Sequence, residues 1–217
     1  MKDWRRRRMV ITAGPTREKL DPVRYLSNES SGKMGWALAE AARDAGARVT
    51  LVAGPTHLSS PKGVTFIAVT SAREMCAATL RAARNAHAVI GAAAVADWRP
   101  TRVSRTKLKK GNTAPVLRLT PNPDIMGTLA KARRGAFPRL AGFALESDHI
   151  LANARKKLRE KKLDLIVANS PSALGHSKTR AWIVQSGRPP TPFIGDKKNL
   201  ARRILARLLE TVPPHDR

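Results

Sequence analysis

The sequence has one cysteine, few aromatic residues and no two histidines at the spacing of metal ligands. Each of these shortages argues against a class of protein. The single Cys76 excludes an internal disulfide and a metal centre built from several cysteines. The 5 histidines are scattered along the 217 residues, which argues against a compact zinc site. Aromatic residues make up 4% of the chain, and no zinc-finger, helix-turn-helix or aromatic RNA-binding signature accompanies them.

Several sequence motifs of nucleotide and acyl chemistry are also missing. The first apolar segment is not followed by Gly-x-Gly-x-x-Gly, and no P-loop is present, which argues against a nicotinamide-dependent reductase and against P-loop hydrolysis. A Gly-x-Ser-x-Gly nucleophile elbow is absent too. Without an evident nucleophile, any chemistry must rely on positioning and charge neutralisation, which suits reactions of phosphates.

Long hydrophobic runs are lacking as well. No apolar run reaches the length of a membrane span. The basic N-terminal run Arg5–Arg8 is followed by a strand-like pattern, not by the apolar core of a signal peptide. We therefore expect a cytoplasmic protein with no membrane partner, folded as a single domain over residues 1–217.

Acidic residues are scarce: 16 of them face 41 basic residues, giving a net charge of +25. Such a surface attracts polyanions, so a basic nucleic-acid-binding α/β module is one functional hypothesis. The basic residues are spread along the whole chain and are mostly arginine. A generally arginine-rich composition therefore explains the charge better, and the same field would also attract an anionic small substrate.

Apolar segments alternate with helical patterns, which predicts a doubly wound, mostly parallel, Rossmann-like α/β sheet. Strands are expected over residues 9–14, 48–53, 65–69, 88–94, 140–145 and 163–167, and helices over 33–45, 72–85, 122–133 and 149–162. Ser71 and Glu74 form a capping box, and Asn122 is expected to cap its helix with Pro123 at the first position. Ligands should lie at the carboxyl ends of the strands.

The rest of the chain departs from this alternation. Residues 99–111 are polar and basic without a core pattern, and a short strand is expected over 116–119, so the region 99–120 is interpreted as an exposed arm or flap. Residues 179–185 and 191–194 predict a C-terminal hairpin. Asp196 then caps a last helix that extends to about residue 211.

Three groups of polar residues are candidate binding sites. Ser30, Ser31, Gly32 and Lys33 open the first helix, where free N–H groups and the helix dipole favour an anion; an ordinary serine cap is the alternative. Asp97 ends a buried strand and Lys107 lies in the arm, although such residues are also common in turns and on solvated loops. Lys157 and Lys161 share one helix face, with a solvated face as the alternative.

An ordered set of motifs resembles the phosphopantothenoylcysteine synthetase family of coenzyme A biosynthesis. These motifs begin at residue 11 and end at residue 169. They are Ile11–Glu18 (ITAGPTRE), Leu20–Arg24 (LDPVR), Ser27–Gly35 (SNESSGKMG), Ala92–Trp98 (AAAVADW), Lys107–Lys110 (KLKK), Asn122–Ile125 (NPDI), Gly142–Glu146 (GFALE) and Leu163–Asn169 (LDLIVAN).

This resemblance implies a reaction. The carboxylate of 4′-phosphopantothenate attacks the α-phosphate of CTP, pyrophosphate leaves, and cysteine converts the resulting acyl-cytidylate into the amide. Mg²⁺ accompanies the nucleotide, with unassigned protein ligands, and ATP in place of CTP is the alternative. The resemblance also implies a homodimer. Because no flavodoxin-like decarboxylase domain is expected, FMN is not expected, and a separate decarboxylase is a candidate partner.

The resemblance also implies roles for individual residues. Asn28 corresponds to the family asparagine that contacts the acyl-cytidylate, Arg24 to an active-site arginine, and Lys107 to the flap lysine that closes over the intermediate. Glu29 stands where many members have histidine. The implied nucleotide contacts, besides Lys107, are Gly91, Ala92, Ala93, Asp97, Pro123, Asp124, Ile125, Met126, Phe143, Lys157 and Lys161.

Overall fold

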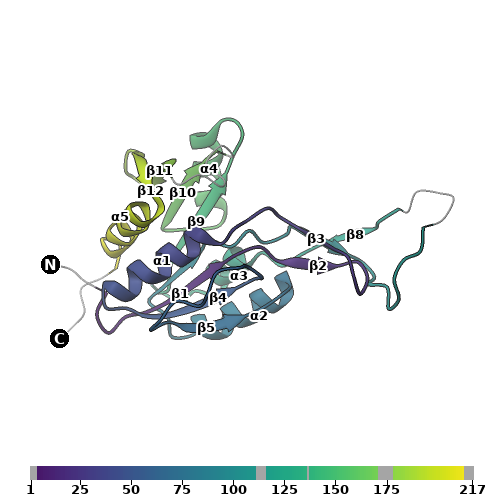
Figure 1. Cartoon of the computed structure of the whole chain (residues 1–217). Coiled ribbons are helices and arrows are strands. Elements are labelled where there is room, and N and C mark those ends of the chain that lie inside the picture. Colours follow the sequence, from purple (N-terminus) through teal and green to yellow (C-terminus); the bar gives the residue numbers. More distant parts are fainter. Residues whose placement is uncertain (1–3, 111–115, 136, 171–177, 213–217) are drawn as a thin grey trace.

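The computed structural model, which describes residues 4–110, 116–135, 137–170 and 178–212, contains one large sheet with helices on both faces (Figure 1). The sheet has eight strands in the order β12-β11-β10-β9-β6-β1-β4-β5. Its parallel part consists of β1 (Arg8–Ala13), β4 (Arg48–Ala53), β5 (Thr65–Ala68), β6 (Ala88–Gly91), β9 (Arg139–Leu145) and β10 (Leu165–Asn169). The predicted doubly wound, mostly parallel sheet is therefore confirmed.

The predicted C-terminal hairpin is also confirmed. It consists of β11 (Lys178–Val184) and β12 (Thr191–Asp196), which are antiparallel to each other, and β11 is antiparallel to β10. The Asp196 side chain accepts a hydrogen bond from the N–H of Asn199 at 2.7 Å and so caps α5 (Lys197–Leu209), as predicted.

The helices divide into two groups that cover opposite faces of the sheet. α1 (Lys33–Asp44) and α5 pack on one face, whereas α2 (Ala72–Ala83), α3 (Ile125–Ala132) and α4 (Ile150–Glu160) pack on the other. Alternate residues of β1 show this division, since Met9 and Ile11 belong to the first core and Val10 to the second. Both faces of the central strands are therefore buried, which explains their continuous apolar sequence.

An arm projects from this body (Figure 1). It contains a hairpin of β2 (Arg17–Lys19) and β3 (Tyr25–Ser27), and a second ribbon of β7 (Trp98–Pro100) and β8 (Leu119–Pro121). The exposed arm was predicted, but β2, β3 and β7 were not, and the strand expected over 116–119 lies over 119–121. Residues 111–115 of the predicted arm lie outside the described residues.

Two helix starts differ from the predictions. Asp124, not Asn122, caps α3 by accepting a hydrogen bond from the Gly127 N–H at 3.1 Å. At α1 the cap is Gly32 in a left-handed conformation (φ 74°), so a serine cap by Ser30 or Ser31 was wrong. Ser30 instead accepts from the Gly32 N–H at 3.3 Å, before the helix begins.

Two strand boundaries also differ. The strand expected over 88–94 ends at Gly91, although the N–H groups of Ala92 and Ala94 still donate to the carbonyls of Thr12 and Gly14. The strand expected over 163–167 lies over 165–169. It starts later because Lys162 has a positive φ of 47° and the Leu163 N–H still bonds to the Leu158 carbonyl of α4. The capping box of Ser71 and Glu74 at α2 is confirmed.

Candidate active site

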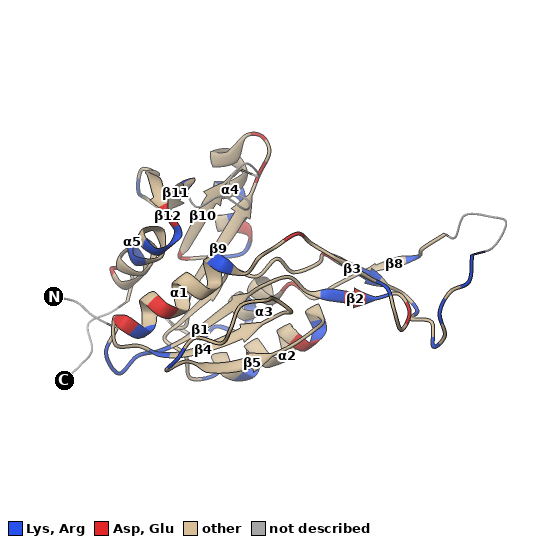
Figure 2. Cartoon of the chain, viewed as in Figure 1, with Lys and Arg blue, Asp and Glu red and all other residues tan. Residues whose placement is uncertain are grey.

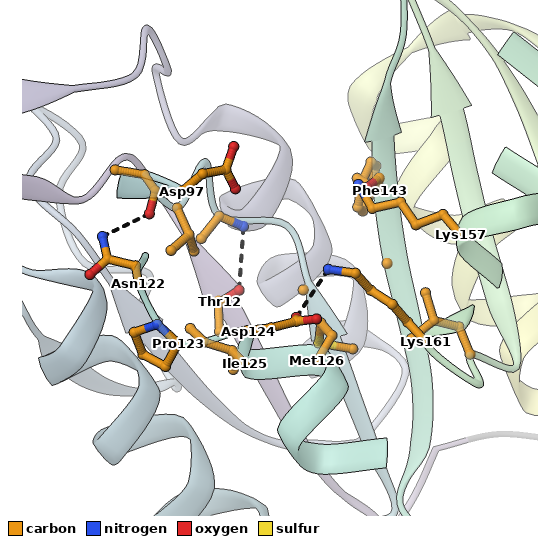
Figure 3. A pocket seen from close by; sticks show the side chains of 16 residues that line it. Thr12, Asp97, Asn122, Pro123, Asp124, Ile125, Met126, Phe143, Lys157 and Lys161 are labelled. Atoms are coloured by element: carbon orange, nitrogen blue, oxygen red, sulfur yellow. Dashed lines mark hydrogen bonds and ion pairs between the residues drawn. The ribbon is translucent and has the colours of Figure 1, made fainter. Parts of the chain in front are cut away.

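A cavity of about 240 Å³ opens at the carboxyl ends of β1, β6 and β9 (Figure 3). Thr12, Gly91 and Gly142 lie side by side on these neighbouring strands and line the cavity. The two glycines keep this position open, because an added Cβ would lie 2.8 Å from Met126 Sδ at Gly91 and 2.9 Å from Leu163 Cδ1 at Gly142. The chain continues from β1 toward one edge of the sheet and from β6 toward the other, so the cavity lies at the topological switch point.

The loop 92–97, which follows β6, forms one wall of the cavity and is held by side chains from four segments. The Thr12 and Thr16 hydroxyls accept hydrogen bonds from the N–H groups of Ala93 (3.3 Å) and Ala96 (3.0 Å), respectively. On the carbonyl side, the Asn28 amide donates to Ala94 and Val95 (3.4 and 3.1 Å), and the Asn122 amide donates to Ala96 (2.8 Å). Side chains thus fix the wall that carries Asp97.

The opposite wall is cationic. Lys157 of α4 and Lys161, the C-cap residue of α4, both face the cavity (Figure 3). The Lys157 ammonium donates to the Phe143 carbonyl at 3.1 Å, and the Lys161 ammonium lies 3.0 Å from an Asp124 oxygen. Two ammonium groups and the start of α3 therefore converge on one space, which is the arrangement that binds phosphates.

The pKa values of Lys157 and Asp124 on this wall are shifted, because charged groups lie close together in a partly buried space. Burial, followed by the neighbouring Lys161 charge, lowers the pKa of Lys157 below its ordinary value. For Asp124, burial acts to raise the pKa, but the hydrogen bond from the Gly127 N–H and the Lys161 ammonium outweigh it and leave the pKa lowered. Asp124 is thus held as a carboxylate between the helix start and Lys161.

A second cavity, of about 500 Å³, lies beside the start of α1. Asn28, Ser30, Ser31 and Lys33 line it, together with residues 55–58 that follow β4. No described side chain caps the first turn of α1, so its N–H groups stay available beside this cavity. Asn28 connects the two cavities, because it lines the second and bonds to Val95, which lines the first.

Arg24 and Lys107 lie elsewhere, since neither is among the described residues that line these two cavities. Arg24 is in the arm, where its guanidinium binds Asp21 and donates to the Leu108 carbonyl at 2.7 Å. Lys107 is an exposed residue of the same region. The two residues are therefore close to each other in the arm and separate from the cavity linings.

The first cavity brings together most of the predicted nucleotide contacts. Gly91 and Asp97 line it, and Ala92 lies between two residues that do. The other predicted residues that line it are Ala93, Pro123, Asp124, Ile125, Met126, Phe143, Lys157 and Lys161. The predicted anion seat belongs to the second cavity, with Gly32 beside it as the helix cap.

Sequence reasoning missed several residues of the site. Thr12 and Gly142 line the cavity, Thr16 fixes its wall, and Asn122 is a wall support, not a helix cap. Thr12 could have been identified from the sequence, because it is a polar residue in a mostly apolar strand that was expected to be buried. A buried hydroxyl needs a partner, which here is the loop after β6.

Neither the metal-binding nor the basic side chains of the described residues gather at one place. Within the described part of the chain, no group of three or more His, Cys, Asp or Glu residues is arranged to hold a metal ion. Lysine and arginine are spread over the arm and over helices on both faces, not gathered on one surface (Figure 2). Among the described helices, none is both long and apolar enough to cross a membrane.

Comparisons with known proteins agree on one family. The family model described as "DNA/pantothenate metabolism flavoprotein C-terminal domain" matches residues 4–212. The bifunctional coenzyme A biosynthesis protein CoaBC of Vibrio cholerae is 48% identical over 171 residues, which are 78% of this chain and 43% of that protein. A cysteine/cysteine sulfinic acid decarboxylase from an unknown prokaryote is 43% identical over 95% of this chain and 59% of its own length.

Among solved structures, the crystal structure of the C-terminal domain of a CoaBC protein is similar with a TM-score of 0.83 and 37% identity. The match covers 97% of each chain. The chain thus spans between 43% and 59% of the length of the two curated relatives quoted above, but 97% of this separate domain.

Proposed function

The chain belongs to the DNA/pantothenate metabolism flavoprotein C-terminal domain family, and from this premise we propose that it ligates cysteine to 4′-phosphopantothenate at the expense of CTP. The carboxylate oxygen attacks the α-phosphorus, the bond to the β-phosphate oxygen breaks, and pyrophosphate leaves. The cysteine amine then attacks the acyl carbon and loses a proton, and CMP leaves as the amide forms. The similarity to the C-terminal domain of a CoaBC protein supports this assignment over the decarboxylase named for another relative.

One observation carries the proposal: a single cavity contains the Asp97 end of the loop after β6, the start of α3, and two lysines of α4. A binding site for a nucleoside triphosphate needs a group that contacts the nucleoside and cations that contact the phosphates. Asp97 serves the nucleoside, and Lys157 and Lys161 neutralise the phosphates as charge moves to the leaving pyrophosphate. The amides at the start of α3 donate to phosphate oxygens.

The carboxylates of the cavity fit a Mg²⁺ that arrives with the nucleotide. Asp97 and Asp124 line the cavity, and Mg²⁺ is commonly held by one or two carboxylates, water and substrate phosphates. Because Asp97 is assigned to the nucleoside, Asp124 is the candidate protein ligand. The ion supplies neutralisation of the triphosphate charge when bound.

The second cavity is the proposed seat for 4′-phosphopantothenate. The start of α1, Ser30, Ser31 and Lys33 offer N–H, hydroxyl and ammonium donors for its phosphate. Asn28 stands between the two cavities, so the acid bound in the second can present its carboxylate toward the nucleotide in the first. We assign to Asn28 the role of holding the acyl-cytidylate while cysteine attacks.

The central experiment measures pyrophosphate release with CTP and with ATP, each with and without 4′-phosphopantothenate and cysteine. We expect release to require the acid, turnover to require cysteine, and CTP to be preferred. Equal nucleotide hydrolysis with and without the acid would refute the ligase. Preference for ATP would keep the ligase and reject the acyl-cytidylate.

Two variants test the assigned residues. Asn28→Ala should allow activation but stall amide formation, so the acyl-cytidylate should accumulate and be detected by mass spectrometry. Lys107→Ala should lower the rate of pyrophosphate release by about 10²-fold, because a charge that stabilises the transition state is removed. An unchanged rate in either variant would remove that residue from the mechanism.

Three further properties complete the proposal: a homodimer, no bound FMN, and cooperation with a separate decarboxylase. The fusion of the two functions that the name of the bifunctional relatives indicates supports the last of these. Light scattering, the absorption spectrum of the purified chain and a coupled assay with an added decarboxylase test them in turn.

A further inference from the structure

Asp21 is a buried carboxylate directly before an exposed stretch, residues 22–25. It lies in the turn between β2 and β3, within the arm, and its side chain is 0% exposed. The neighbouring Val23 and Tyr25 are exposed. Burial of a carboxylate is costly unless it is well hydrogen-bonded, so the contacts of Asp21 should explain its position.

The two carboxylate oxygens of Asp21 serve different segments. Oδ1 accepts from the backbone N–H groups of Val23 (2.9 Å) and Arg24 (2.8 Å) and so shapes the turn. Oδ2 accepts from Nε (2.9 Å) and Nη2 (2.6 Å) of Arg24 and from the N–H of Leu108 (3.1 Å). Arg24 holds the pKa of this carboxyl well below its usual range, so Asp21 stays charged.

Further hydrogen bonds fasten the same two segments. Nη2 of Arg24 donates to the Leu108 carbonyl at 2.7 Å, and the Ser104 N–H donates to the Leu20 carbonyl at 2.9 Å. Residues 104–108 are thus held at both ends against the turn 20–24. Lys107 precedes Leu108 directly, so its backbone is fixed by the Asp21 contact.

The turn itself is attached to the body of the molecule. Oε1 of the buried Glu18 accepts from the Ala72 N–H at the start of α2 (2.9 Å), and the Arg17 N–H donates to the Thr70 carbonyl (2.8 Å). A continuous hydrogen-bonded route therefore leads from α2 through the β2–β3 hairpin to the segment that carries Lys107.

We propose that Asp21 is a positioning residue of the ligase: it holds Arg24 and the Lys107 segment together and so sets where the Lys107 charge stands. This inference rests on the proposed function, in which Lys107, which lies outside both cavity linings of its own chain, acts on the nucleotide of the second copy in the proposed homodimer. Arg24 acts in part through the same contact, because its Nε and Nη2 groups are occupied by Asp21 and Leu108.

The variant Asp21→Asn tests the contact directly. An amide offers one acceptor oxygen where the carboxylate offers two, so it cannot serve both the turn and the Leu108 segment. It also removes the charge opposite Arg24. The matched control is Asp164→Asn, because Asp164 is a mostly buried carboxylate that likewise accepts from arginines, Arg133 and Arg139, and from the Leu140 N–H, away from the arm.

The first measurement is limited trypsin cleavage after the basic residues of segment 102–110, located by mass spectrometry. Losing hydrogen bonds to a charged group should raise the open population, and hence cleavage, by about tenfold or more in Asp21→Asn. Asp164→Asn should leave cleavage in this segment at the unmodified rate. Equal cleavage in Asp21→Asn and the unmodified chain would overturn the proposal, and this readout does not depend on the proposed function.

The second measurement is pyrophosphate release. Misplacement of a reacting group by about 1 Å can cost about 10²-fold, so kcat/KM should fall by that order in Asp21→Asn and stay unchanged in Asp164→Asn. In a Lys107→Ala background, Asp21→Asn should lower kcat/KM further by less than about twofold, because the two changes remove the same effect. Full additivity would refute positioning of Lys107. If the unmodified chain releases no pyrophosphate, the proposed function fails, while the cleavage result still decides whether Asp21 holds the arm.

Discussion

At the scale of single residues, the space at the bottom of the first cavity, where Gly91 faces Met126, depends on the missing side chain of Gly91. In Gly91→Ala the new Cβ would lie 2.8 Å from Met126 Sδ, and the flexible methionine would be displaced toward the cavity. Overpacking of this kind costs about 1–3 kcal/mol of folding stability, and the displaced methionine should raise the nucleotide KM because it occupies cavity space. Steady-state kinetics with varied nucleotide measures it. The double variant with Met126→Ala should recover the KM, and a normal KM in Gly91→Ala alone would show that the nucleotide does not use this floor.

A second residue-scale prediction concerns pH. Because burial and Lys161 lower the pKa of Lys157, this lysine loses its charge at a lower pH than an ordinary lysine. Its attraction for an anionic nucleotide is complete below that lowered pKa and is lost as the pH rises through it. The nucleotide KM should therefore rise on the alkaline side, and the rise should be absent in Lys157→Arg, since arginine stays protonated to above about pH 12.

The control for this prediction is Lys156→Arg on the same helix. The Lys156 side chain is 68% exposed and lies 4.0 Å from Glu160, outside the cavity lining. It should leave the alkaline rise unchanged. An alkaline rise that persists in Lys157→Arg would assign it to another group.

The nucleotide contacts were expected from the family resemblance, because local patterns alone left a solvated face or a turn as the alternative. Lys157 and Lys161 stand one turn apart on a helix, and the structure brings both into one cavity. Asn122 was interpreted as a helix cap and Thr16 was not singled out, because their contacts are with the carbonyl and N–H of Ala96, a residue distant in sequence. Local patterns carry no information on such pairings, so a local cap was the natural interpretation of Asn122.

At the scale of elements, the attachment of the β2–β3 hairpin to α2 depends on the buried carboxylate of Glu18. Glu18 is 3% exposed and accepts from the Ala72 N–H at the start of α2. In Glu18→Ala this donor is left unsatisfied, so we expect a loss of about 1–3 kcal/mol in the free energy of unfolding. Urea denaturation measures it. Ser71→Ala, which removes only the cap of the same helix, should cost about 1 kcal/mol, and a smaller loss for Glu18→Ala than for Ser71→Ala would contradict the role of Glu18.

The same hairpin shows why some elements could not be predicted. β1, β4 and β10 are continuous apolar runs buried on both faces, and their sequence is sufficient to identify them. β2 and β3 have three residues each, alternate poorly, and are stabilised by Asp21 and Glu18 across long separations. In the arm, tertiary contacts thus determine which residues form strands. In the sheet, the burial of apolar residues determines the strands, and this is visible in the sequence.

At the scale of the whole molecule, binding through the net charge of +25 and binding in the first cavity should depend differently on the salt concentration. Lysine and arginine are distributed over the arm and both helical layers (Figure 2), so any polyanion would meet a diffuse field. Diffuse attraction depends on counterion release and decreases steeply with salt. In the proposed function, Lys157 and Lys161 would act instead at close range on a phosphate bound in the cavity that they line, where screening is weaker.

We therefore expect binding of duplex and single-stranded nucleic acid, measured by fluorescence anisotropy, to disappear by about 200 mM salt. The nucleotide KM should change far less over the same range, because the two lysines lie within a Debye length of the phosphates they contact. Lys157→Met with Lys161→Met should raise the nucleotide KM strongly and leave weak nucleic-acid binding nearly unchanged, since only two of 41 basic residues are removed. Sequence-selective binding that survives this salt would instead favour a nucleic-acid-binding module, because selectivity requires base contacts that a diffuse field does not provide.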